Sequence, residues 1–225
     1  MSLDVEVLGE EEWSLLVGRR LTEIMAGHHG MRLCLATGVT TSPVYRQTRV
    51  AGGPSIFLLD EFGGLPAQDP ARCAVMFRRD FTFPRFSVPD VDSPDPDAAA
   101  ESYGEAVRER ELDLAVVGLG RNGHIGMNEP GSNRGSRTRK VELAETTSRR
   151  ALAYGASTMP RWGITVGLTE LMESRELWLV VTGAYKAEVL AETMRCTIGP
   201  DLPASFLRDH PNATLLADTA AAGLL

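Results

Sequence analysis

The chain of 225 residues has few of the residues that mark disulfide-bonded or zinc-binding proteins. It has three cysteines, Cys34, Cys73 and Cys196, which lie far apart and form no C-x-x-C pair. An odd number without such spacing argues against both a disulfide framework and a zinc site, so we interpret them as reduced thiols. Because Cys34 lies inside the apolar run "LCLA", we expect it to be buried.

Long apolar runs and an excess of positive charge are also missing. No run approaches the ~20 residues of a membrane-spanning helix. The first residues, "MSLDVEVLGEEEW", are acidic and lack the features of a signal peptide, so we expect a cytoplasmic protein without a membrane partner. The net charge of −7 argues against nucleic acid as a partner. An anionic small molecule would therefore have to be held by a local cluster of donors.

Apolar segments of strand length alternate with amphipathic stretches along the chain. The apolar segments show no polar alternation, which is typical of parallel strands that are buried on both faces. We therefore predict an α/β fold with a doubly wound, mostly parallel sheet flanked by helices on both faces. The Pro/Asp-rich loop 87–97 is too short to separate two domains, so we expect one domain over 1–225. The predicted strands are 31–37, 55–61, 112–120, 176–183 and 213–218, and the predicted helices are 10–27, 98–111, 163–174 and 184–195.

The segment "GLGRNGHIGMNEPGS" after the third predicted strand contains G-x-G-x-x-G at Gly118, Gly120 and Gly123. A dinucleotide site would need these glycines to open a helix, followed by a second strand and an acidic residue about 20 positions on. Here they lead into a stretch rich in Gly, Asn, Ser and Arg, with Pro130 in its middle. We therefore reject a dinucleotide site.

A phosphate site is indicated by the other strand ends, where ligands gather in such folds. Gly38 follows the first predicted strand, and a helix is expected to begin near Ser42 and Pro43. Backbone N–H groups at such a junction favour an anion, although a plain strand–helix turn explains the pattern equally well. The groups that could complete the site are Thr37, Thr40, Lys186, Arg149 and Arg150.

Acid–base chemistry is indicated by Asp60 and His124. Asp60 ends a predicted strand, where a carboxylate is either a helix cap or a catalytic base, and taken alone the cap is favoured. Glycines surround His124, and Asn122 or Glu129 could orient its ring. Together with a phosphate site, these groups suit proton transfer next to the carbonyl of a sugar phosphate. The chain has neither a G-x-S-x-G nucleophile motif nor metal-ligand spacing.

Several longer motifs occur in one order along the chain. They include "LATGVTTSPVY", "LLDEFGGLP", "DLAVVGLGRNGHIGMNEPGS" and "WGITVGLTELMESRELWLVVTGAYKA". In these motifs the chain resembles the glucosamine-6-phosphate deaminase family, within a wider group that includes 6-phosphogluconolactonase. "DEFGGLP" and "GHIGMNEPG" resemble the deaminase branch, since lactonases more often carry a DER-x-V-P segment and continue G-H-T-A-S.

The resemblance implies a modified Rossmann-like fold, no cofactor, and an isomerising deamination of an amino-sugar phosphate. It implies that Asp60 moves a proton between C2 and C1, that His124 assists ring opening, and that Glu129 orients His124. Asn122 stands where the family normally has Asp. The residues implied to bind the substrate and its phosphate are Thr37, Gly38, Val39, Thr40, Gly118, Gly120, Lys186 and an arginine, for which Arg150 is favoured over Arg149.

Three functions stay open at this stage. The first is a deaminase acting on glucosamine 6-phosphate or a close relative. The second is a lactonase or simple isomerase, which would need only His124 and the phosphate site. The third is a sugar-phosphate-binding module without chemistry, which would not need Asp60. Each has a small-molecule sugar phosphate as its partner, and none excludes a homo-oligomer.

Overall fold

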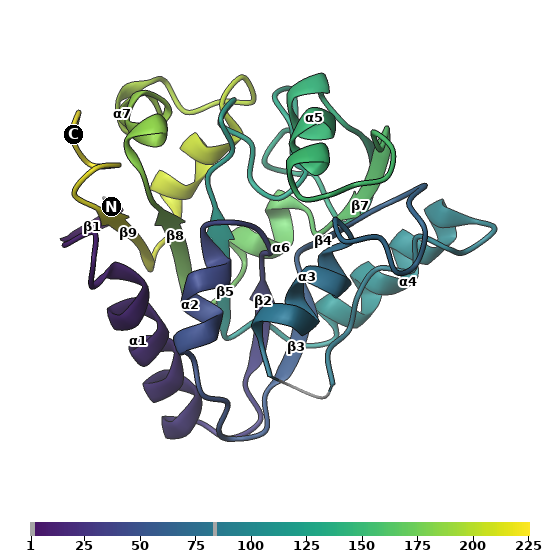
Figure 1. Ribbon diagram of the computed structural model, residues 1–225, viewed down its shortest axis with the longest axis horizontal. Helices are drawn as coiled ribbons and strands as arrows, with labels where there is room; N and C mark the ends of the chain where they lie inside the picture. Colours follow the sequence, from purple (N-terminus) through teal and green to yellow (C-terminus); the bar gives the residue numbers. More distant parts are fainter. Residues whose placement is uncertain (1–2, 83–84) are drawn as a thin grey trace.

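The computed structural model describes residues 3–82 and 85–225 and is built around a six-stranded sheet (Figure 1). Every neighbouring pair of strands in this sheet runs parallel, in the order β1-β9-β8-β5-β2-β3. The strands are β1 (Asp4–Leu8), β2 (Arg32–Leu35), β3 (Ser55–Leu58), β5 (Leu114–Gly118), β8 (Leu177–Val181) and β9 (Ala213–Asp218).

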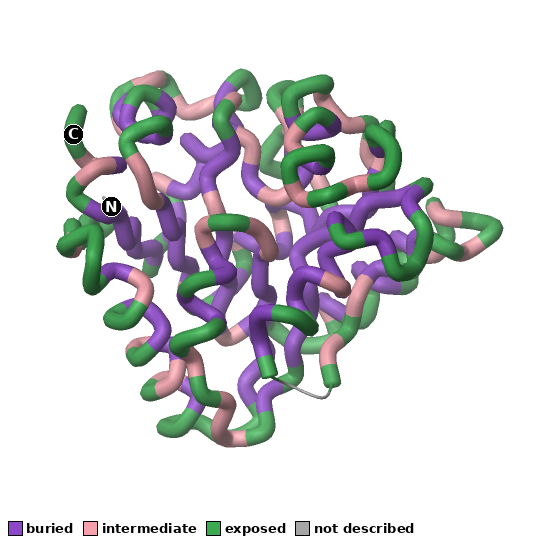
Figure 2. Tube along the Cα trace, viewed as in Figure 1, coloured by how far each residue is buried: buried purple, intermediate pink, exposed green. Residues whose placement is uncertain are grey.

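Helices cover both faces of the sheet, and Figure 2 shows the strands as the buried interior between them. Alternate residues of β8 illustrate the two layers, because Trp178 packs into one apolar core and Leu179 into the other. The first core includes residues of α1, α2 and α3, and the second includes residues of α4, α6 and α7. The helices are α1 (Trp13–Gly27), α2 (Thr41–Gln47), α3 (Cys73–Asp80), α4 (Pro96–Arg108), α5 (Glu145–Ala153), α6 (Leu168–Met172) and α7 (Ala187–Arg195).

Local sequence explains where several helices begin and which face they bury. In α1, apolar residues recur every four positions from Trp13 to Met25, so one stripe of the helix meets the sheet. At the start of α4, the Asp95 side chain accepts the N–H of Ala98, and Pro96 occupies the first turn. In the part of the chain that the structure describes, no helix is long and apolar enough to cross a membrane.

A second sheet of three short antiparallel strands lies beside the first. Its order is β4-β7-β6, with β4 at Asp60–Phe62, β7 at Trp162–Thr165 and β6 at Arg139–Glu142. The sequence had not predicted this sheet. It matters for function because β4 carries Asp60.

The predicted α/β fold with a mostly parallel sheet is confirmed, as is the burial of Cys34. Two element predictions are wrong in part. The predicted strand 55–61 is divided at Leu59, since β3 and β4 belong to different sheets. The predicted helix 163–174 begins only at Leu168, because residues 162–165 pair with β4 and β6. A Cβ at Gly163 would lie 2.3 Å from the Met127 sulfur, so the close pairing of β7 depends on a glycine there.

Candidate active site

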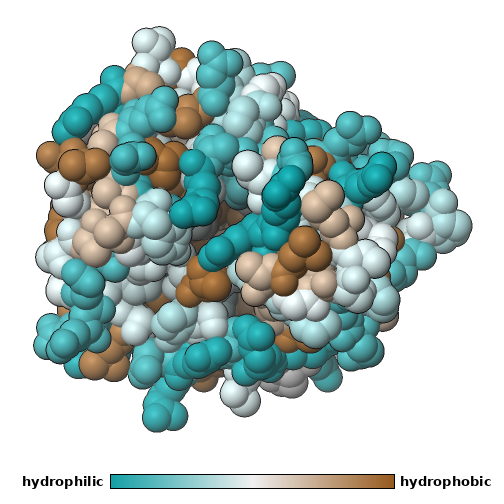
Figure 3. Space-filling view, turned by 45° about the horizontal axis from the view of Figure 1, so that its top comes forward, coloured by the Kyte–Doolittle hydropathy of each residue, from teal (hydrophilic) through white to brown (hydrophobic). Residues whose placement is uncertain are grey.

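A cavity of about 430 Å³ opens at the carboxyl ends of the parallel strands. Figure 3 brings this edge of the molecule forward and shows a hollow bordered by hydrophilic side chains. The cavity is lined by the segments that follow β2, β5 and β8, by Asp60 and Phe62 of β4, and by α5. The lining residues that the sequence predicted are Thr37, Gly38, Val39, Thr40, Asp60, Gly118, Gly120, Asn122, His124, Arg149, Arg150 and Lys186.

Asp60 begins β4 and does not end a parallel strand as expected from the sequence. Its side chain is only 8% exposed, and burial raises its pKa to about 6, with the neighbouring Glu61 carboxylate adding to the rise. Contacts with Cys73 and His124 act in the opposite direction. The capping role belongs to Glu61, whose oxygens accept N–H groups at the start of α3. A carboxylate with a pKa close to neutrality can take up and return a proton.

His124 belongs to a small polar cluster. Its Nδ1 lies 3.3 Å from Glu129 Oε2 and 3.2 Å from the Thr147 hydroxyl of α5. Asn122 donates its amide to the same Glu129 oxygen at 2.9 Å. Burial alone would raise the pKa of Glu129, but the contacts with His124, Thr147 and Asn122 outweigh it and lower that pKa. Glu129 does not line the cavity. Its negative charge lies beside Nδ1 of His124, so Nε2 is the ring nitrogen that is left to contact a substrate.

The glycine-rich loop supports the imidazole directly. Gly120 donates its N–H to the carbonyl of His124, and a Cβ at position 120 would lie 2.3 Å from the ring. Gly123 has a φ of +79°, which favours glycine because a side chain would be strained there. Residues 119–138 contain no helix. The G-x-G-x-x-G pattern therefore belongs to a turn that positions His124.

The predicted phosphate site faces the same cavity. The helix expected near Ser42 is α2, with Pro43 in its first turn. The Thr37 hydroxyl is buried close to the Cys73 thiol, and a ligand could satisfy its remaining hydrogen-bonding capacity. Lys186 is 8% exposed and donates to the carbonyl of Leu119. Burial, together with the positive charges of Arg150 and Arg121, lowers the pKa of Lys186 to about 8.

The choice between the two neighbouring arginines is guided by their contacts. Arg149 pairs with Glu145 on the exposed side of α5, with its Nε 2.9 Å from the carboxylate. Arg150 points its Nε at the hydroxyl of Tyr154, 3.4 Å away, and its charge reaches Lys186. Arg150 therefore stays the better candidate for the phosphate.

Sequence reasoning missed several polar residues of the cavity, namely Cys73, Arg121, Thr146, Thr147, Tyr154 and Tyr185. Cys73 belongs to no motif and lies 13 residues from its partner Asp60. Tyr154, at the end of α5, lies beside Gly38, which follows β2. Arg121 in "GLGRNGH" and Tyr185 next to Lys186 in "TGAYK" could have been suspected from their positions. Within residues 3–82 and 85–225, no three His, Cys, Asp or Glu side chains cluster closely enough to hold a metal ion.

Known proteins are similar to this chain in sequence and in fold. The model of the family described as glucosamine-6-phosphate isomerases/6-phosphogluconolactonase matches residues 11–216. A glucosamine-6-phosphate deaminase of Leuconostoc citreum is 35% identical over 204 residues, which cover 85% of this chain and 86% of that protein. One of Rhodopirellula baltica is 34% identical over 241 residues, covering 99% and 96%.

Two solved structures extend the comparison. A monomeric glucosamine-6-phosphate deaminase has a TM-score of 0.91 and 30% identity, with 99% of this chain and all of that chain covered. The 6-phosphogluconolactonase of Trypanosoma brucei has a TM-score of 0.80 and 20% identity, with 99% and 98% covered. At that identity the second likeness shows the fold alone.

Proposed function

Because the chain belongs to the family of glucosamine-6-phosphate isomerases and 6-phosphogluconolactonases, we propose that it is a glucosamine-6-phosphate deaminase. Relatives at 33–36% identity over most of the chain carry this name, as does the structure with a TM-score of 0.91. The single observation that carries the proposal is the cavity itself. It brings the buried carboxylate Asp60, the His124–Glu129 pair and the cations Lys186 and Arg150 together.

The reaction begins with ring opening. His124 moves a proton from the anomeric hydroxyl to the ring oxygen, and the C1–O5 bond breaks to give the open-chain aldehyde. Its contact with Glu129 at 3.3 Å stabilises the imidazolium that forms while the proton is carried. Asn122, a neutral amide, holds Glu129 in place without adding a second negative charge.

Asp60 then moves a proton along the carbon chain. The carboxylate removes the proton from C2, the electrons move onto the C1 carbonyl oxygen, and that oxygen takes a proton from water to give an enolamine. The same carboxyl group returns the proton to C1, and the nitrogen releases one proton to water, which leaves a ketimine at C2. Water adds to the ketimine and releases ammonia and fructose 6-phosphate. Burial favours this step because a base with its pKa raised to about 6 is a stronger proton acceptor than an exposed aspartate.

The phosphate anchors the substrate at the other end of the cavity. We assign it to the segment Thr37–Thr40, Lys186 and Arg150. A charge-assisted hydrogen bond contributes roughly 1.5–3 kcal/mol. Three such contacts would offset the repulsion between a phosphate and a chain whose net charge is −7.

The test is ammonia release from glucosamine 6-phosphate, with galactosamine 6-phosphate and 6-phosphogluconolactone assayed beside it. We expect ammonia and a ketose 6-phosphate from one of the amino sugars. Hydrolysis of the lactone without ammonia release would instead make the protein a lactonase. Thermal protection by all three compounds without turnover would make it a binding module.

A further inference from the structure

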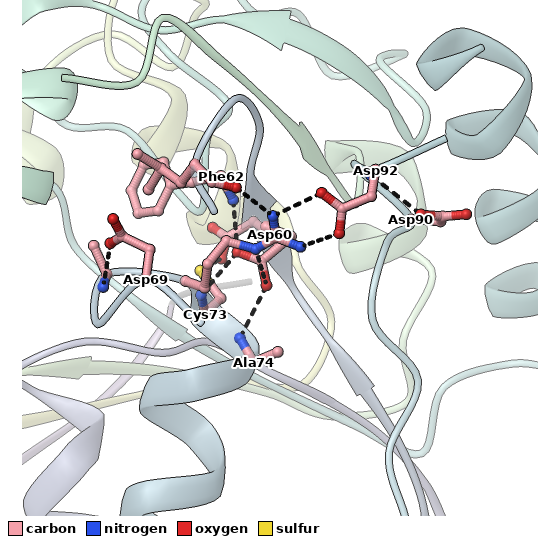
Figure 4. A network of polar contacts seen from close by, with 11 residues as sticks. Asp60, Phe62, Asp69, Cys73, Ala74, Asp90 and Asp92 are labelled. Carbon is pink, nitrogen blue, oxygen red and sulfur yellow. Dashed lines mark hydrogen bonds and ion pairs between the residues drawn. The ribbon is translucent and has the colours of Figure 1, made fainter. Parts of the chain in front are cut away.

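The first N–H groups of α3 donate hydrogen bonds to the side chain of Glu61 in β4, which docks the helix onto the strand (Figure 4). The buried carboxylate of Glu61 accepts the N–H of Cys73 at 2.8 Å and the N–H of Ala74 at 3.0 Å. Arg72 lies 3.5 Å from Glu61 and makes two hydrogen bonds to Asp92, at 3.1 and 2.9 Å. Glu61 therefore caps α3 from a neighbouring strand, and Arg72 balances its charge.

This docking fixes where the Cys73 side chain lies. Its sulfur is 3.3 Å from Asp60 Oδ1, and both side chains line the active-site cavity. Cys73 is 2% exposed. Among the residues that the structure describes, the thiol is the only hydrogen-bond donor to the Asp60 carboxylate.

The thiol is suited to donate a hydrogen bond and unsuited to attack a substrate. Burial raises the pKa of Cys73 well above its ordinary value, and the carboxylates of Asp60 and Glu61 raise it further. A nucleophilic or redox-active cysteine needs the thiolate, which this environment disfavours. The protonated thiol is therefore the favoured form of Cys73.

We propose that Cys73 is a positioning residue for Asp60, in which the S–H group holds Oδ1 and leaves Oδ2 to exchange the proton with the substrate. This inference rests on the proposed deaminase function, which makes Asp60 the base. A donor on one oxygen fixes the rotation of the carboxyl group about its Cβ–Cγ bond. It also favours the ionised form, which is the form that can accept a proton.

The other charged groups around Asp60 remain in place when the thiol is changed. Glu61 of β4 raises the pKa of Asp60, and His124 of the glycine-rich loop lowers it. Cys34, Tyr45, Tyr103 and Tyr154 also interact electrostatically with the carboxylate, but burial raises their own pKa values and favours their neutral forms. A change in the pKa of Asp60 when Cys73 is substituted would therefore result from the lost hydrogen bond.

The experiment compares Cys73→Ala with Cys73→Ser, which differ only by a hydroxyl donor. The pH dependence of kcat/KM for the amino sugar phosphate is measured for both and for the unchanged protein. At low pH, kcat/KM falls as Asp60 is protonated, and we call this part of the pH profile the acid limb. We expect Cys73→Ala to move the midpoint of the acid limb upward by about 0.5–1 pH unit, the shift that one lost hydrogen bond gives. Cys73→Ser should keep the limb near its original position, with KM changed little in either variant. Titration of the substrate is common to all three proteins and cancels.

Cys34→Ala is the matched control, because it removes another buried thiol that makes no hydrogen bond to Asp60. It should lower the melting temperature without moving the acid limb. Overlapping pH profiles for Cys73→Ala and Cys73→Ser would overturn the proposal. So would a shift of equal size in Cys34→Ala, because the effect would then come from loosened packing.

A second measurement does not depend on activity. The carboxyl ¹³C signal of Asp60, assigned by its loss in Asp60→Asn, can be titrated by NMR in the unchanged protein and in Cys73→Ala. An upward shift in Cys73→Ala alone supports the positioning role even if no amino sugar is deaminated, in which case only the proposed function fails. Identical titration curves would refute the role of Cys73 while leaving the deaminase proposal intact.

Discussion

Asp60 and His124 are the two residues whose loss should stop the chemistry while leaving binding intact. General acid–base groups typically contribute about 10²–10⁴ in rate. We therefore expect Asp60→Asn and His124→Gln each to reduce kcat by at least ~10²-fold. Phosphate binding should persist, because neither side chain belongs to the proposed phosphate site. Steady-state kinetics give the loss in turnover, and a competition assay with inorganic phosphate checks binding.

Exposed residues of the same kinds provide the controls. Asp90→Asn and His28→Gln remove similar groups from the surface and should leave kcat unchanged. If both active-site variants kept full turnover, the mechanism would be wrong. If only Asp60→Asn kept it on a lactone substrate, the chemistry would be lactone hydrolysis.

The shifted pKa values of Asp60 and Lys186 predict the pH range of activity. Asp60, with its pKa raised to about 6, must be ionised to act as a base, so kcat/KM should fall as the pH drops through about 6. Lys186, with its pKa lowered to about 8, must be charged to hold the phosphate, so kcat/KM should also fall as the pH rises through about 8. A plot of kcat/KM against pH should therefore be bell-shaped, since it reports the free enzyme.

The variant Lys186→Arg tests whether Lys186 causes the fall of kcat/KM at high pH. An arginine stays charged across this range, so the alkaline fall should weaken or move upward while the acid limb remains. An alkaline limb that is unchanged in Lys186→Arg would assign it to another group or to the amine of the substrate.

At the scale of secondary-structure elements, α5 places two adjacent arginines in different surroundings. Arg150→Ala should raise KM and weaken the binding of inorganic phosphate by about 10-fold or more, the factor that corresponds to one charge-assisted contact. Arg149→Ala is the matched control on the same helix. Its partner is the exposed Glu145, so its loss should change KM little. Calorimetric titration with phosphate measures both, and a larger effect at Arg149 would reverse the assignment.

The elements also show how far the sequence could be interpreted. The parallel strands were predictable because segments such as "LWLVV" are apolar on both faces, and β8 is fully buried. The break between β3 and β4 was not, because Leu59 continues the apolar run and the change of sheet depends on pairing with β7, a hundred residues away. "WGIT" runs directly into a helical stretch, and its pairing with β4 and β6, which are distant in the chain, makes it a strand.

The same limit applies to the candidate site. Asp60, His124 and Lys186 follow apolar segments or glycines, so their positions in the sequence drew attention to them. Cys73 and Thr147 act on Asp60 and His124 from 13 and 23 residues away, through helices whose docking is set by tertiary contacts. No local pattern encodes such a pairing, which explains why it emerged only with the structure.

At the scale of the whole molecule, the cavity is formed by three parts of the fold. The parallel sheet contributes the proposed phosphate site, the small antiparallel sheet contributes Asp60, and α5 contributes Thr147 and Arg150. A ligand that bridges these parts binds the folded state alone and must stabilise it by mass action. The free energy gained is about 2.7 kcal/mol at a ligand concentration of 100 Kd.

For a chain of this length, that gain should raise the melting temperature by about 5–10 °C. We expect inorganic phosphate or fructose 6-phosphate to produce such a rise, measured by thermal denaturation at increasing ligand concentration. Lys186→Ala should lose most of the shift, because the same amount of ligand then represents a much smaller multiple of its Kd. Sodium chloride at matched ionic strength is the control for screening of the acidic surface. A rise of equal size with the chloride salt would show that the stabilisation comes from screening, and the proposed phosphate site would then have to lie elsewhere.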